Sequence, residues 1–125
     1  MGTSTVVVLG ASAKPERYSH KALVLLRENG YRVVPVHPVL ESIDDFGVVH
    51  SLDDIDEPVH TVSLYVNSER LEAHLPAIQR MKPGRVIFNP GTESARLRDR
   101  LEQSGIRCIE ACTLVLLRTG QFERA

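Results

Sequence analysis

Tryptophan is absent from this sequence of 125 residues, cysteine occurs only twice, and aromatic residues make up just 5%. No apolar run comes near the roughly 20 residues that a membrane-spanning helix requires. The charges almost cancel, because 15 Lys and Arg residues stand against 16 Asp and Glu residues and leave a net charge of −1. This balance argues against a general nucleic-acid binder and against a polybasic membrane surface, so we expect neither partner. A local basic patch for one small anion is compatible with it.

The two cysteines, Cys108 and Cys112, lie close together near the end of the chain. They lack CxxC spacing, and no pair of histidines has zinc-finger spacing, so we expect no structural metal. Free thiols are typical of reducing compartments, which favours a cytoplasmic protein. The length corresponds to one domain, so we expect residues 1–125 to form it without a separate catalytic domain.

Five short runs rich in Val and Ile predict β-strands. They are Thr5–Leu9, Arg32–Val36, Val59–Val66, Arg85–Phe88 and Ile106–Glu110. Most are continuous apolar runs, which is typical of strands covered on both faces. Helical patterns lie between them, so the sequence predicts an α/β fold with a doubly wound parallel sheet. Numbered along the chain, five strands fit the order 3-2-1-4-5.

Three helices are expected between these strands. Residues 19–29 and 93–104 each carry an apolar stripe and end before a glycine. A third apolar face follows Asn67, and we expect Pro76 to split that helix, since an interior proline loses a backbone hydrogen bond. The connection 37–58 holds only one helical hint, a single turn after Ser51.

Ligands of doubly wound sheets bind outside the carboxyl ends of the strands, so the segments that follow the strands are the candidate site. The segment from Gly10 to Ser19 joins a strand to a helix through small and polar residues. Its backbone N–H groups can hold an anion, with charge from Lys14 and Arg17 and hydroxyls from Ser12 and Ser19. A plain turn with Ser19 as helix N-cap explains the same residues.

Three familiar nucleotide or phosphate sites fit this sequence badly. The G-x-G-x-x-G positions hold Gly10, Ser12 and Pro15, and a Walker motif is absent. NAD sites place a carboxylate at the end of the second strand, where this chain has His37-Pro38. A receiver domain needs an aspartate after the third strand, where Asn67 stands and fits a helix N-cap.

Two further features follow the last two strands. Asn89-Pro90-Gly91-Thr92 enters a helix and can hold a ligand on its backbone N–H groups, or form a simple turn that Thr92 caps. Cys112 follows the fifth strand, before a predicted helical turn over 113–118. A helix N-terminus can activate a thiol, but most free cysteines are small buried hydrophobes, which is what we expect of Cys108.

The combination resembles the CoA-binding domain family, which includes small stand-alone CoA-binding proteins and the N-terminal domain of the succinyl-CoA synthetase α subunit. The resemblance runs over nearly the whole chain. The stretches that carry it are Gly10-Ala11-Ser12-x-Lys14-Pro15, Gly30-Tyr31-x-Val33-x-Pro35-Val36-x-Pro38, Gly47 with Ser51-Leu52, and Glu110-Ala111-Cys112.

The resemblance implies a Rossmann-like domain that holds coenzyme A (CoA) across the strand ends. It assigns backbone N–H contacts with the pyrophosphate to Gly10, Ala11, Ser12 and Ala13, and places Lys14 and Arg17 near phosphates. It further implies a nucleoside end near His37 and Pro38, and a cleft rim formed by Asn67, Asn89, Pro90 and Gly91.

The function expected from this sequence is non-catalytic binding of CoA or an acyl-CoA. One alternative is an enzyme that uses Cys112 as an acyl- or thiol-transfer nucleophile. Others are a module that binds NAD or another adenine nucleotide, and a subunit whose partner chain supplies catalysis. The sequence leaves a homodimer or a partner subunit open.

Overall fold

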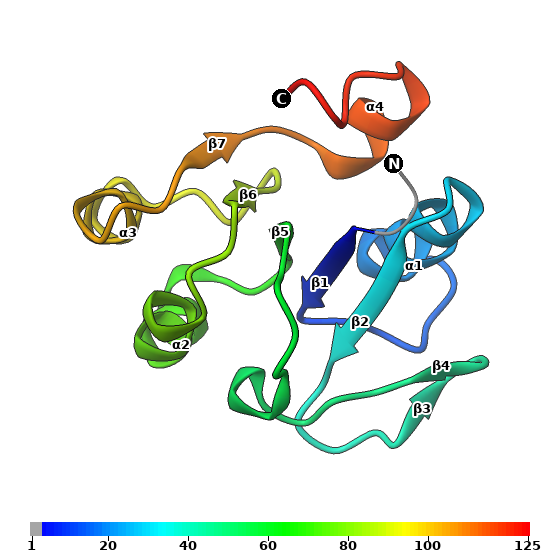
Figure 1. Ribbon diagram of the computed structural model, residues 1–125. Coiled ribbons are helices and arrows are strands. Elements are labelled where there is room, and N and C mark those ends of the chain that lie inside the picture. The colour runs from blue at the N-terminus through cyan, green and yellow to red at the C-terminus, as the bar shows by residue number, and fades with distance from the viewer. Residues whose placement is uncertain (1–3) are drawn as a thin grey trace.

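A five-stranded parallel sheet forms the centre of the computed structural model, which describes residues 4–125 (Figure 1). Residues 1–3 of the expected domain lie outside the described residues. The strands are β1 (Thr5–Leu9), β2 (Arg32–Val36), β5 (Thr61–Leu64), β6 (Arg85–Phe88) and β7 (Cys108–Glu110). All five lie within the predicted runs, and the predicted α/β, doubly wound, Rossmann-like fold is confirmed.

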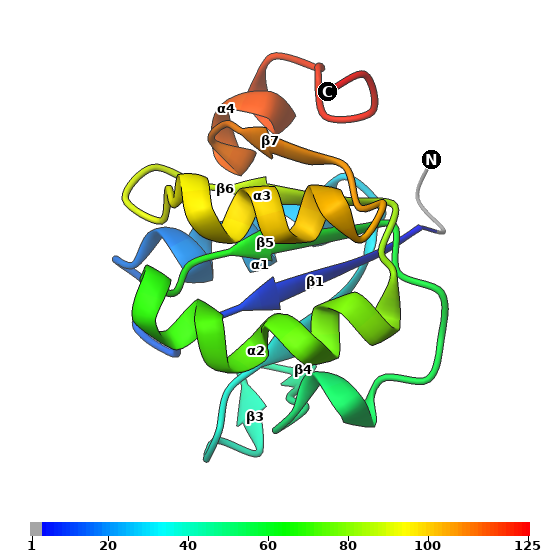
Figure 2. The same ribbon diagram turned by 90° about the vertical axis from the view of Figure 1, so that its left-hand side faces the viewer.

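Helices cover both faces of the sheet. They are α1 (Tyr18–Glu28), α2 (Ser68–Met81), α3 (Ala95–Gln103) and α4 (Thr113–Arg118). Figure 2 shows α2 and α3 in front of the sheet and α1 behind it. Within residues 4–125, none of the helices has the length and hydropathy needed to cross a bilayer.

The hydrophobic core has two parts because strand side chains alternate between the two faces. On the α2–α3 face, Leu71, Leu75 and Leu97 pack with strand residues such as Val7 and Leu9. The other face is built by strand residues together with apolar side chains of α1, α4 and the short strands β3 (Ser42–Ile43) and β4 (Phe46–Gly47).

The predicted strand order 3-2-1-4-5 is wrong, because the sheet has the order β2-β1-β5-β6-β7. In terms of the five predicted strands this is 2-1-3-4-5. The connection after β2 turns back along it, and Val49 bridges Val36 on the outer edge of β2. With that edge covered, β5 pairs with the free side of β1. The point where the strand order reverses therefore lies between β1 and β5.

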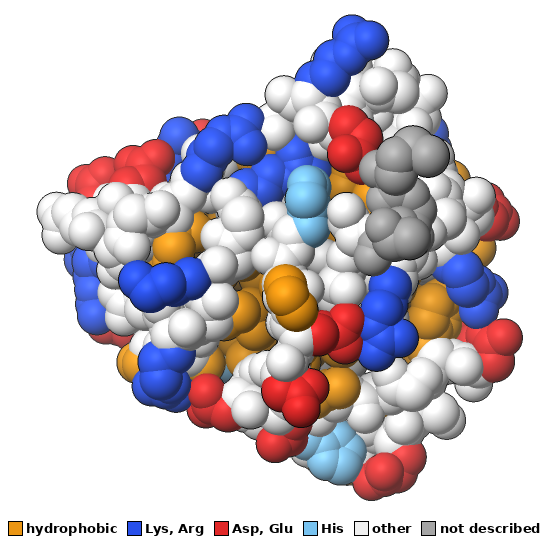
Figure 3. Space-filling model, in the orientation of Figure 1, with side chains coloured by type: hydrophobic (Ala, Val, Ile, Leu, Met, Phe, Trp, Pro, Cys, Tyr) orange, Lys and Arg blue, Asp and Glu red, His pale blue; other side chains and the backbone are white. Residues whose placement is uncertain are grey.

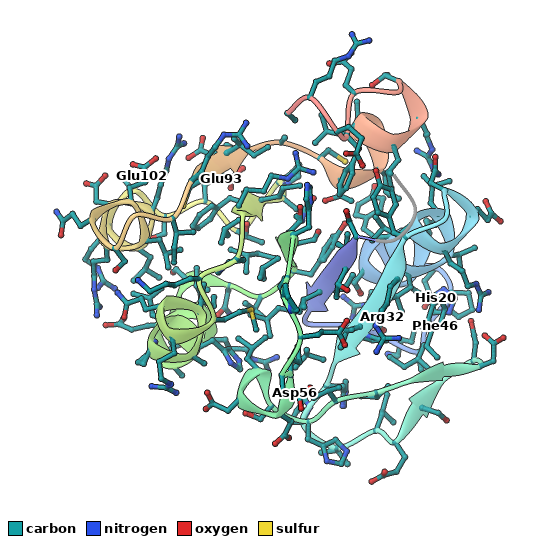
Figure 4. The ribbon with its side chains drawn as sticks, in the orientation of Figure 1. His20, Arg32, Phe46, Asp56, Glu93 and Glu102 are labelled. Carbon is teal, nitrogen blue, oxygen red and sulfur yellow. The ribbon has the colours of Figure 1, made fainter. Side chains whose placement is uncertain are left out.

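The β3–β4 hairpin fixes this connection against α1. His20 of α1 contacts Asp44 at 2.8 Å, and the Arg27 guanidinium lies 4.3 Å from the centroid of the Phe46 ring. Figure 4 labels His20 on α1 and Phe46 on β4, the two elements that these contacts join. The end of β2 and the turn at His37 are held by backbone hydrogen bonds, from the His37 N–H to the Val49 carbonyl at 3.1 Å and from the Val49 N–H to the Pro35 carbonyl at 3.0 Å.

Three local expectations need correction. Helix α2 runs through Pro76 without a break, because Leu71 and Leu75 before the proline and Ile78 after it are all fully buried. Helix α1 begins at Tyr18, so Ser19 is a buried first-turn residue and not the N-cap. Thr92 is not the N-cap of helix α3.

The N-cap of α3 is Ser94, whose side chain accepts a hydrogen bond from the N–H of Leu97. The other predicted caps are confirmed. Ser51 caps the short 3₁₀-helix η1 (Leu52–Asp54), and the Asn67 side chain accepts a hydrogen bond from the N–H of Arg70 at the start of α2. Asn67 thereby fixes the first turn of α2 at the carboxyl edge of the sheet.

Candidate functional site

The carboxyl edge of the sheet holds two cavities, one on each side of Tyr65. The larger, of about 560 Å³, lies over the ends of β1, β2 and β5, and we call it the switch-point cleft. Its walls are Leu9, Gly10, Ala11, Arg17, Val36, His37, Pro38, His50, Tyr65, Val66, Arg70, Ala73 and His74. It lies where doubly wound sheets bind their ligands.

Two exposed arginines give the switch-point cleft a positive wall. Arg17 is the residue immediately before α1, and Arg70 lies in the first turn of α2, so both stand beside helix N-termini. Within residues 4–125, neither guanidinium has an ion-pair partner, in contrast to Arg27 and Arg32. Two unpaired guanidiniums and two helix N-termini make this cleft suited to an anion.

His37 closes the turn after β2. Its Nδ1 accepts hydrogen bonds from the N–H groups of Val39 and Leu40, each at 3.0 Å. An Nδ1 that accepts carries no proton, so in the neutral ring the proton is on Nε2, which can donate to a ligand. In helix α2, burial lowers the pKa of His74 below its ordinary value, which favours the neutral ring of that residue.

Two backbone N–H groups of the loop after β1 already donate hydrogen bonds within the protein. The Ala11 N–H donates to the Val36 carbonyl at 3.2 Å, and the Lys14 N–H donates to the Ser12 Oγ at 3.1 Å. Ser12 and Ala13 thus remain the main backbone donors that the loop can offer to an anion. Lys14 and Ala13 are exposed and do not line the cleft, whereas Gly10 and Ala11 do.

The second cavity, of about 350 Å³, lies beyond Tyr65 over the ends of β5, β6 and β7. We call it the apolar cavity, since most of its walls are aromatic or aliphatic. They are Tyr18, Tyr65, Asn89, Pro90, Cys112, Leu114, Val115 and Arg118. Burial raises the pKa of Tyr65 to about 12, so its phenol stays protonated at neutral pH.

Asn89 joins three elements beneath the apolar cavity. Its amide nitrogen donates to Ser63 Oγ and to the Leu64 carbonyl, each at 2.9 Å, and its Oδ1 accepts from the Thr113 N–H at 2.8 Å. Ser63 and Thr113 also share a hydrogen bond at 2.8 Å. The Asn89 side chain is 1% exposed and bonded at both ends, so it holds α4 against β5 and β6.

The two cysteines have different surroundings. Cys108 is buried in β7, and burial raises the pKa of its thiol to about 11, so it is an inert core residue. Cys112 is half-buried, lines the apolar cavity and is the residue immediately before α4. A thiol in this position can meet a ligand that reaches the cavity.

The structure therefore gathers some of the predicted site residues and separates others. The predicted residues that line a cavity are Gly10, Ala11, Arg17, His37, Pro38, Asn89, Pro90 and Cys112. The others lie outside both cavities: Ser12, Ala13, Lys14, Ser19, Asn67 and Gly91.

Sequence reasoning missed Tyr65, Arg70, His74 and Arg118. Arg70 had a signal in the sequence, because it follows the predicted cap Asn67 by three residues and so lies in the first helical turn at the carboxyl edge. The position of Arg118 depends on how α4 packs, which the sequence does not reveal.

Charges elsewhere are mixed. The face in Figure 3 shows Lys and Arg interspersed with Asp and Glu, and no large area of one sign. Many surface charges are paired, as in the contact of Arg80 with Asp53 at 2.9 Å and of Arg96 with Glu72 at 2.8 Å. The unpaired arginines of the cleft stand out against this background.

Comparison with known proteins identifies similar chains. A segment of 66 residues is 33% identical to the protein YneT of Bacillus subtilis (strain 168) and covers 53% of this chain. This chain spans about half, 49%, of the length of that relative. Among solved structures, the cell-free ID.343 protein of Thermus thermophilus is 31% identical, with a TM-score of 0.87 over 95% of this chain and 90% of its own.

A crystal structure of another protein, described as uncharacterized, is 34% identical, with a TM-score of 0.89 over 95% of this chain and 98% of its own. The sequence pattern of the CoA binding domain matches residues 4–118, which is nearly the whole chain. On this match, together with the doubly wound fold and the cleft over its strand ends, the chain belongs to the CoA-binding domain family.

Proposed function

We propose that this protein binds coenzyme A along the carboxyl edge of its sheet, without catalysing a reaction itself. The observation that carries the proposal is the switch-point cleft with its two unpaired arginines, Arg17 and Arg70. Membership of the CoA-binding domain family supports the same ligand.

The nucleotide end of CoA carries the phosphates and fits the switch-point cleft. Arg17 and Arg70 supply charge, and the Nε2 of His37 supplies a further hydrogen-bond donor. Charge-assisted hydrogen bonds to phosphate are about twice as strong as neutral ones, which makes the arginines the main contributors to affinity.

The pantetheine arm is the uncharged part of CoA and would extend from the switch-point cleft toward the apolar cavity. Tyr65 lines both cavities, so a ligand that passes over this residue contacts both. Neighbouring strands lie about 4.8 Å apart, and the path from β1 across β5 and β6 to β7 is therefore about 14 Å. A thiol carried along this path arrives beside Cys112.

An NAD site is disfavoured by the end of β2. No carboxylate of the described residues lines the switch-point cleft. Glu41, the next acidic residue after the strand, lies 3.4 Å from His50 and has an 86% exposed side chain. A ribose 2′-hydroxyl therefore finds no carboxylate partner of the kind that NAD sites provide.

Isothermal titration calorimetry of the purified protein with CoA, 3′-dephospho-CoA and NAD tests the proposal. We expect CoA to bind most tightly and NAD most weakly. Arg17→Gln combined with Arg70→Gln should lower the affinity for CoA at least about a hundredfold, because each removes a charged hydrogen-bond donor worth about 1.5–3 kcal/mol.

Arg107→Gln is the matched control, since Arg107 is exposed, precedes β7 and lines neither cavity. It should leave the affinity for CoA unchanged. Binding of NAD without binding of CoA would overturn the proposal. If the double variant and Arg107→Gln bind CoA equally tightly, Arg17 and Arg70 do not contribute to CoA binding.

A further inference from the structure

We infer that the apolar cavity holds the acyl group of a CoA thioester, and that Arg118 selects acyl groups that end in a carboxylate. This inference rests on the proposed binding of CoA. It goes further, because it names the class of acyl group that the site accepts.

The cavity has the character of an acyl site. Five of its walls, Tyr18, Tyr65, Pro90, Leu114 and Val115, present rings or aliphatic carbon. Its volume of about 350 Å³ is at the lower end of the roughly 300–1,000 Å³ typical of ligand cavities. A short acyl chain fits such a volume, whereas a long fatty chain does not.

Exposed apolar side chains gather at the same place. Large hydrophobic side chains among residues 4–125 are exposed at three positions, Tyr18 at 70%, Val39 at 72% and Val115 at 53%. Tyr18 and Val115 are both part of the wall of the apolar cavity. Exposed apolar surface costs free energy in water, so a ligand that covers these two side chains gains affinity.

Arg118 gives the cavity a single charge. It is the last residue of α4, and none of the described residues forms an ion pair with it. Among residues 4–125, no Asp or Glu lines the cavity, so none of them competes there for the guanidinium. A carboxylate at the end of the acyl chain can accept two parallel hydrogen bonds from it.

Tyr65 contributes its ring to the cavity. Its hydroxyl is buried, and the Ser63 and Thr113 hydroxyls, which are bonded to each other at 2.8 Å, lie near it. The aromatic face of Tyr65, and not its hydroxyl, is therefore the part that a ligand in the cavity can contact.

The test compares two stable thioether analogues, S-(3-carboxypropyl)-CoA and S-butyl-CoA, with CoA itself. The two side arms have the same carbon chain up to the terminal group, and neither can exchange with Cys112. We expect the carboxypropyl analogue to bind about tenfold more tightly than the butyl analogue in calorimetry, the effect of one charge-assisted contact. Arg118→Gln should abolish this preference for the carboxypropyl analogue over the butyl analogue, whereas Arg107→Gln should keep it.

The outcomes separate the inference from the proposed function. If CoA does not bind, the proposed function fails and the inference fails with it. If CoA binds but both analogues bind equally well to wild-type protein and to Arg118→Gln, only the inference fails. If neither analogue binds and sedimentation shows a dimer that Val115→Asp dissociates, the cavity is a contact between copies of the chain and the inference is wrong.

Discussion

The contact between the loop after β1 and the end of β5 shapes the junction of the two cavities, and Gly10 makes it possible. Gly10 has a φ of +92°, and a Cβ added there would lie 2.9 Å from the carbonyl oxygen of Tyr65 and 2.9 Å from Cγ1 of Val66. Gly91 has nearly the same φ, +93°, but nothing lies within 4 Å of an added Cβ. The two glycines therefore form a matched pair.

Substitution by alanine separates backbone strain from close packing. Gly91→Ala should cost only the strain of a positive φ, about 1–2 kcal/mol. Gly10→Ala carries the same strain together with a clash against backbone, which adds about 1–3 kcal/mol as overpacking does. We expect the free energy of unfolding to fall by about 1–2 kcal/mol for Gly91→Ala and by about 2–5 kcal/mol for Gly10→Ala.

Urea unfolding followed by circular dichroism measures both values on one scale. The slope of the free energy of unfolding against urea concentration should match that of the wild type, so that the variants differ in the midpoints of their unfolding transitions. Equal losses of stability in the two variants would refute the reasoning, because they would mean that the loop after β1 does not press against Tyr65 and Val66.

Three further predictions concern single side chains. Asn89→Ala should lower the free energy of unfolding by about 2–4 kcal/mol in the same urea assay, because it leaves the buried Thr113 N–H and Leu64 carbonyl without a partner. A loss below about 1 kcal/mol would contradict the role of Asn89 in joining α4 to the sheet, because lost packing alone costs about 1 kcal/mol. Cys112 should react with iodoacetamide in the free protein and more slowly with CoA present, while Cys108 stays unlabelled in both. If mass spectrometry finds Cys112 unlabelled in the free protein, its thiol is not accessible from the cavity. Hydrogen bonds from Arg32 and Thr5 lower the pKa of Glu57 from 4.5 to about 2, so this carboxylate stabilises the fold above its unfolded pKa and loses that effect as pH falls toward 2. The free energy of unfolding should therefore depend less on acidic pH in Glu57→Gln than in the wild type, and identical pH profiles would argue against the ion pair.

Much of the fold could be predicted because apolar runs and their lengths report strands directly. The strand order could not, because it depends on the connection 37–58, which contains no α-helix. There the hairpin contacts of Asp44 and Phe46 with α1, and the bridge of Val49 to β2, decide which edge stays open. These are contacts between distant segments, and no local pattern encodes them.

Pro76 illustrates how tertiary packing overrides a local preference. The proline removes one hydrogen bond from α2, but the buried Leu71, Leu75 and Ile78 hold the helix against the sheet on both sides of it. Packing of an amphipathic face supplies most of the stability of helices in proteins, so the helix continues.

The candidate site was predictable where it follows strands and less so where helices contribute. Gly10 and His37 come directly after strands and Cys112 follows β7 by two residues, so their positions in the chain lead to the carboxyl edge. Arg70 and Arg118 reach the same edge from α2 and α4, and their positions depend on how those helices lie across the sheet. Lys14, which was predicted to lie near phosphates, lies outside both cavities.

The measurement that tests the central claim most directly is a titration of ¹⁵N-labelled protein with CoA, followed by backbone amide chemical shifts. We expect the largest changes at the carboxyl edge, at Ala11 and Ser12, at His37, at Arg70 and at Cys112. Changes confined to the opposite edge, around Glu57 and Arg85, or no changes at millimolar CoA, would contradict the account.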